Sequence, residues 1–192
     1  NQSKKETTFI KKVSYLRTLE LLHTLEKFKE GEALAKETEK YIINDSLHTN
    51  YFLTLYLNMV IIRAYIDNND YKKAISYSKK RLETNGTQFF CTVFKIFEFI
   101  SHYKLGNYEN LLYSVDSWIK TIRSKRKQFA LEKLLIKFFR SVCYKKTNKE
   151  KKQLLTNTIY QLKELERTQS NYYVNHYFDF AAWFERELEE MK

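Results

Sequence analysis

Proline is absent from the 192-residue sequence, and glycine occurs only three times, as Gly31, Gly86 and Gly106. Sheet proteins need turn residues about every 8 to 12 positions, whereas helices can be joined by turns of Asn, Asp and Lys. The scarcity of both residues therefore argues against a β-sandwich or barrel. It favours a chain that is almost entirely helical.

Cysteine is also scarce. Cys91 and Cys143 lie 52 residues apart in apolar runs, so we expect them to pack as small apolar residues and not to form a disulfide framework or a metal site. This usage fits a reducing compartment, and we expect a cytoplasmic protein. Long apolar runs are missing as well. The longest, 52–66, is shorter than the roughly 20 residues that a membrane span requires.

Signature motifs of enzymes are not found. The four histidines do not form HExxH, and there is no glycine-rich phosphate loop or GxSxG elbow. Glu98 and His102, four residues apart, and His176 and Asp179, three apart, have the spacing of pairs that interact along a helix. We therefore expect no catalytic residue, no metal, no cofactor and no enzymatic activity.

The residues that are present suit a folded helical protein. Hydrophobic residues make up 43% and aromatic residues 16%, which is enough apolar surface to offset the entropy of ordering the chain. Polar breaks between periodic apolar runs predict nine helices. Their expected ranges are 7–26, 29–43, 50–67, 70–84, 88–104, 107–123, 128–144, 148–167 and 171–190.

One phrase occurs twice. In IIRAYIDNNDYKKAISYSKK, Tyr65 precedes Tyr71, and in ISHYKLGNYENLLYSVDSW, Tyr103 precedes Tyr108. The spacings of 38 and 37 residues between equivalent tyrosines match the length of one helical hairpin. The repeat predicts an all-α superhelix of about four antiparallel hairpins plus a C-terminal capping helix.

The first phrase resembles the tetratricopeptide repeat (TPR), in which a late aromatic residue, a short turn and a small residue such as Ala74 set the packing of a helix pair. The chain departs from that family in having Ile62 and Ile100 where small residues are usual, and Leu111 in place of alanine. The resemblance implies a protein-binding scaffold. We expect residues 1–192 to form a single TPR-like domain, and the first residue, Asn1, leaves open that this is the C-terminal part of a longer protein.

Charge is concentrated in one stretch. The formal net charge of the chain is +11, and residues 120–152 alone hold 13 basic and two acidic side chains, so the rest of the chain is neutral overall. Two trios within this stretch have the i, i+3, i+7 or i, i+4, i+7 spacing of a helical stripe. They are Lys120, Arg123 and Lys127, followed by Lys133, Lys137 and Arg140.

Stripes on the same side of two antiparallel helices would form one basic patch, which would attract an acidic protein or peptide, nucleic acid or anionic lipid. The simpler alternative is a solvated, lysine-rich helix face. We expect a non-enzymatic protein- or peptide-binding scaffold. The alternative is a nucleic-acid-binding or transcription-regulatory module that uses the basic helices between residues 120 and 152. The oligomeric state is left open.

The last predicted helix carries an aromatic stripe at Tyr173, Tyr177, Phe180 and Phe184. This spacing is typical of a core face, so we expect the helix to cover the end of the last hairpin. Its glutamates are expected to keep the outer face wet. They are Glu185, Glu187, Glu189 and Glu190.

Overall fold

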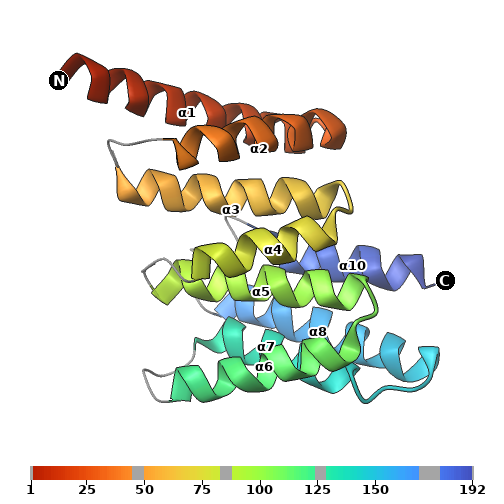
Figure 1. Cartoon of the computed structure of the whole chain (residues 1–192). Coiled ribbons are helices and arrows are strands. Elements are labelled where there is room, and N and C mark those ends of the chain that lie inside the picture. Colours follow the sequence, from red (N-terminus) through yellow and green to blue (C-terminus); the bar gives the residue numbers. More distant parts are fainter. Residues whose placement is uncertain (1, 45–49, 83–87, 124–128, 169–177, 192) are drawn as a thin grey trace. The chain divides into compact units, whose positions relative to one another are not determined.

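The computed structural model describes residues 2–44, 50–82, 88–123, 129–168 and 178–191, with the side chains of Arg123 and Thr168 left out. Every regular element in these ranges is an α-helix, and there are nine (Figure 1). They are α1 (Gln2–Thr24), α2 (Phe28–Ile43), α3 (Tyr51–Asp67), α4 (Tyr71–Leu82), α5 (Gln88–Lys104), α6 (Tyr108–Arg123), α7 (Ala130–Val142), α8 (Asn148–Thr168) and α10 (Phe180–Glu190). The all-α prediction is confirmed.

The helices group into two compact units. The first, Asn1–Leu105, holds α1 to α5, and the second, Gly106–Lys192, holds α6 to α10. The second tyrosine phrase crosses the boundary, because Tyr103 lies in α5 and Tyr108 begins α6. The expected single TPR-like domain stays a prediction.

In the first unit, successive helices share their neighbours. Helix α1 packs against α2 and α3, which also contact each other, and α3 packs against α4 and α5 in the same way (Figure 1). Helix α3 therefore belongs to two triangles of helices and is buried on most of its surface. Leu57, Ile61, Ile62 and Tyr65 are all completely buried. This is the sequential packing expected of a helical-hairpin array.

The hairpins α1–α2 and α3–α4 close with the same turn. The amide of Lys27 donates to the carbonyl of Leu22 over 2.9 Å, and the amide of Asp70 donates to the carbonyl of Tyr65 over 2.8 Å. Both bonds reach back five residues, as in a Schellman motif at the end of a helix. Two positions that share no sequence similarity therefore adopt one backbone turn.

Each such turn needs a left-handed residue. Glu26 has φ +55° and Asn69 has φ +61°, and Gly106, between α5 and α6, has φ +67°. Only glycine adopts this conformation without steric cost, and asparagine tolerates it better than most other residues. Gly106 therefore suits the left-handed position between α5 and α6, whereas Gly86 lies outside the described residues.

The first tyrosine phrase packs as predicted. Ala74 is completely buried, and the rings of Tyr65 and Tyr77 meet edge to face with centroids 6.1 Å apart. The Tyr65 hydroxyl donates to Glu39 Oε2 over 2.9 Å, and the Tyr77 hydroxyl donates to Asn58 Oδ1 over 2.7 Å. Burial raises the pKa of both phenols, so both remain hydrogen-bond donors.

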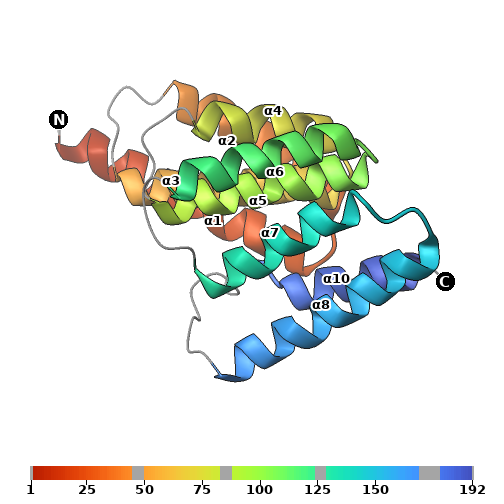
Figure 2. The same ribbon diagram turned by 90° about the horizontal axis from the view of Figure 1, so that it is seen from below.

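In the second unit, α6 packs against α7, α7 against α8, and α8 against α10 (Figure 2). Aromatic rings also join α10 to α7, since Phe138 and Phe184 lie 4.5 Å apart and Phe139 and Trp183 lie 6.4 Å apart between centroids. The expected C-terminal helix therefore covers the α7–α8 hairpin.

Two details of the last helix differ from the prediction. Helix α10 begins at Phe180 and not at residue 171, because Asp179 accepts a hydrogen bond from the amide of Ala182 over 2.8 Å and caps it there. Glu187 is buried, not part of a wet outer face. Phe180 and Phe184 are buried as expected, while Tyr173 and Tyr177 lie outside the described residues.

We expect Ala74→Asp to lower the free energy of unfolding by about 3 kcal/mol or more, because it places a carboxylate at a completely buried position. Urea denaturation followed by circular dichroism measures the change. The matched control, Lys72→Asp, lies on the exposed face of the same helix and should change the value by less than about 0.5 kcal/mol. Equal midpoints for the two variants would contradict the packing of α4.

A candidate binding surface on α6 and α7

Two polar contacts fix how α6 and α7 lie against each other. The indole Nε1 of Trp118 donates to Glu132 Oε1 over 3.2 Å, and Arg140 Nε lies 3.0 Å from Asp116 Oδ1. Positions 116 and 118 on α6 thus meet positions 140 and 132 on α7. The order reverses, so the two helices are antiparallel.

The sequence stripes fall on the outer side of this pair. Lys133, Lys137 and Arg140 are exposed along one face of α7, and Lys120 is exposed on α6. Lys120 follows Asp116 by four residues and shares its helix face. Because Asp116 pairs with Arg140, the row on α6 runs beside the row on α7.

Not all six predicted residues can be placed. The structure describes only the backbone of Arg123, at the end of α6, and Lys127 lies outside the described residues. Four of the six, Lys120, Lys133, Lys137 and Arg140, are therefore brought together on one surface. We call these four residues, with Asp116, the α6–α7 basic face.

The basic side chains of this face differ in whether an acidic side chain pairs with them. Arg140 is paired with Asp116, and both side chains are partly exposed, so the pair contributes at most about 1 kcal/mol to stability. Within the described ranges, Lys120, Lys133 and Lys137 have no acidic partner within ion-pair distance. The charge available to a ligand is therefore mainly that of three lysines.

Residues 120–152 contain two acidic side chains, Glu132 and Glu150, and neither reduces the positive charge of the lysines at the surface of α7. Glu132 is only 1% exposed and turns inward, where it accepts from Trp118 and from the amide of Phe129. Glu150 caps α8, and the backbone amide of Thr147, which donates to it over 3.1 Å, is the main reason why its pKa is lowered. Both carboxylates serve helix ends and interior contacts.

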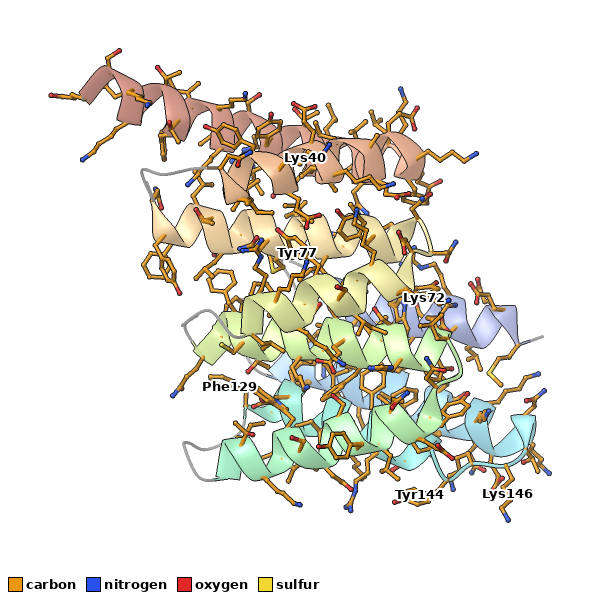
Figure 3. The ribbon with its side chains drawn as sticks, in the orientation of Figure 1. Lys40, Lys72, Tyr77, Phe129, Tyr144 and Lys146 are labelled. Atoms are coloured by element: carbon orange, nitrogen blue, oxygen red, sulfur yellow. The ribbon has the colours of Figure 1, made fainter. Side chains whose placement is uncertain are left out.

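Aromatic side chains border the basic face, which we did not expect from the sequence. Tyr113 is 78% exposed, Tyr144 61% and Phe129 48%, and Figure 3 labels the last two together with Lys146. Tyr144 follows the C-cap residue of α7, Cys143, and Phe129 directly precedes the N-terminal end of the helix. The signal that could have revealed them is spacing, since Phe129, Lys133, Lys137, Arg140 and Tyr144 follow one another at intervals of 4, 4, 3 and 4 residues.

Two histidines outside this face, His23 and His102, contact charged side chains of the helical core. His23 Nδ1 lies 2.6 Å from Asp67 Oδ2, and its Nε2 contacts the guanidinium of Arg63, so both ring nitrogens are engaged in tying α1 to α3. His102 and Glu98 are buried in α5, with the His102 Nε2 3.8 Å from Glu98 and the Lys95 ammonium 2.9 Å from it. This pair is buried and does not lie on a helix surface.

Among the described residues, no three His, Cys, Asp or Glu side chains gather in a way that could hold a metal ion. In the same part of the chain, no helix combines the length and the hydrophobicity needed to cross a bilayer. No protein-family model, curated protein or solved structure matches the chain.

The buried His102 predicts a dependence of stability on pH. Burial lowers the pKa of this imidazole, against the opposing effect of Glu98, to below the value of about 6.5 that it has in the unfolded chain. The unfolded chain then binds more protons, so the stabilising contribution is complete above about pH 6.5 and is lost as the pH falls.

The measurement is urea denaturation of the wild type and of His102→Gln at about pH 7.5 and pH 5. The stability difference between the two proteins should shift toward the variant at the lower pH, because Gln cannot take up the proton. A difference that is the same at both pH values would rule out this role for His102.

Proposed function

We propose that this protein is a non-enzymatic, TPR-like scaffold that binds an acidic protein or peptide on its α6–α7 basic face. Helical-hairpin arrays commonly present extended surfaces of this kind, because each hairpin contacts only its neighbours and leaves its outer face free. The shared-helix packing of α1 to α5 supports the TPR-like part of the proposal.

The observation that carries the proposal is the Asp116–Arg140 pair. It aligns the basic rows of two helices side by side, so that their lysines act on the same ligand and not on opposite sides of the molecule. Charges arranged in this way raise the rate of association with an acidic partner and select its orientation. A lysine ammonium is a compact point charge that accepts many carboxylate geometries, which fits attraction better than detailed readout.

A second candidate, nucleic-acid binding, is favoured by one observation. The exposed rings of Tyr113 and Tyr144 lie toward the Arg140 end of the basic face, and aromatic rings next to cations can stack against unpaired bases. Such binding would weaken steeply as the salt concentration rises, with a log–log slope of about −0.7 for each phosphate neutralised on a single strand. A shallow slope with an acidic peptide would favour the first candidate.

Charge reversal tests the proposal. We expect the triple variant Lys120→Glu, Lys133→Glu and Lys137→Glu to bind a fluorescein-labelled heptaglutamate peptide at least about tenfold more weakly than the wild type. Arg140 is left in place because its reversal would set a glutamate against Asp116. Fluorescence anisotropy at low salt measures the affinity.

A matched control separates local from overall charge. Lys29, Lys40 and Lys72 are exposed in the first unit, and Figure 3 labels Lys40 and Lys72. Reversing these three changes the net charge by the same amount and should leave binding within about twofold of the wild type at equal helicity. Equal losses in the two triple variants would show that only the net charge matters and would refute the assignment of the site.

A further inference from the structure

The α6–α7 basic face is bordered by exposed aromatic side chains at both ends. Along α7, Phe129 and Tyr144 stand one helical turn outside Lys133 and Arg140, and between them every exposed side chain of this row is basic. At 1.5 Å per residue, the 15 steps from Phe129 to Tyr144 cover about 22 Å. We call this row the α7 stripe.

Helix α6 supplies a second row, formed by Tyr113, Asp116 and Lys120, which runs beside the α7 stripe. Tyr113 precedes Asp116 by three residues, and Tyr144 follows Arg140 by four. Since Asp116 pairs with Arg140 and the helices are antiparallel, Tyr113 and Tyr144 lie at the same end of the face. Lys120 lies toward the other end, beside Lys137 and Lys133.

The exposure of these rings is concentrated in one place. Four large aromatic side chains are exposed among the described residues of the second unit, and three of them border this face. They are Tyr113, Phe129 and Tyr144, while the fourth, Tyr160, lies in the middle of α8. Aromatic side chains bury a large area when they bind, and tyrosine is among the residues enriched at the centres of protein interfaces.

From this pattern we infer the chemistry of the partner. This inference rests on the proposed function of the same face. It is an extended acidic segment of about seven residues, since an extended chain advances about 3.3 Å per residue and must cover about 22 Å. Its two ends carry bulky apolar side chains that contact Phe129 at one end and Tyr113 and Tyr144 at the other. Its centre is a run of carboxylates.

An extended segment between the two rows suits their spacing. Its successive side chains point to opposite sides, so alternate carboxylates reach Lys133 and Lys137 on α7 while the others reach Lys120 on α6. Carboxylates on one side repeat at about 6.6 Å, close to the rise of about 6 Å between Lys133 and Lys137.

Single-stranded nucleic acid fits the arrangement less well. Its bases follow every phosphate, and binding grooves for it interleave aromatic platforms with cations along their whole length. Between Lys133 and Arg140 no exposed residue of the α7 stripe is aromatic, because Phe138 and Phe139 are both buried. The aromatic contacts are available only at the ends.

Three labelled probes test the inference by fluorescence anisotropy with the full chain: heptaglutamate, a peptide of five glutamates between Phe and Leu, and heptathymidylate. We expect the apolar-ended peptide to bind about tenfold more tightly than heptaglutamate. The variant Phe129→Ala with Tyr144→Ala should remove this advantage and leave the affinity for heptaglutamate unchanged. Tyr160→Ala, the matched exposed aromatic, should change neither affinity.

The outcomes separate the inference from the proposed function. Equal affinity for the two peptides, or an advantage that survives the double variant, overturns the inference alone, provided that the lysine triple variant still loses heptaglutamate. Unchanged binding in the lysine triple variant overturns the proposed function. Tightest binding to heptathymidylate, or no binding of any probe, overturns both. If Phe129→Ala lowers the helicity, Tyr113→Ala with Tyr144→Ala tests the other end of the face with the same expected result.

Discussion

Each hairpin of the first unit completes its core only by sharing a helix with the next. Helix α3 shows the constraint most clearly, because it must satisfy α1 and α2 on one side and α4 and α5 on the other. Its central residues Ile61 and Ile62 are completely buried in consequence. No helix pair in such an array has a hydrophobic core of its own, so each shared apolar face has to fit more than one neighbouring helix.

The sequence predicted the helical architecture well because its main signals are local. Apolar periodicity identified the nine helices that the described residues form, and Asp70 caps α4 by accepting a hydrogen bond from the amide of Lys73. The turn after α1 was not predictable in this way, since Glu26 is not a residue type that favours a left-handed backbone. That conformation occurs where the chain turns back so that α2 packs against α1.

The candidate surface on α6 and α7 was predicted in part for a similar reason. Helical spacing identified the basic rows, but whether two rows share a side depends on how the helices meet, and that is set by Asp116 and Arg140. Glu132 is an example of a charge that the sequence places wrongly. It counted as a surface charge in the sequence, yet it hydrogen-bonds Trp118 in the interior. Counting charges along a chain gives the total, and tertiary contacts decide which of them a ligand meets.

The two turns closed by Lys27 and Asp70 have a consequence for how the chain reaches its folded state. Each closes a hairpin through hydrogen bonds that reach back only five residues, so the ends of a hairpin meet without a long loop having to close first. Chains whose contacts are mostly local fold fast, and in repeat arrays folding can begin at any hairpin and spread to its neighbours. The first unit therefore has at least two equivalent places, the α1–α2 and α3–α4 hairpins, at which a folding nucleus can form.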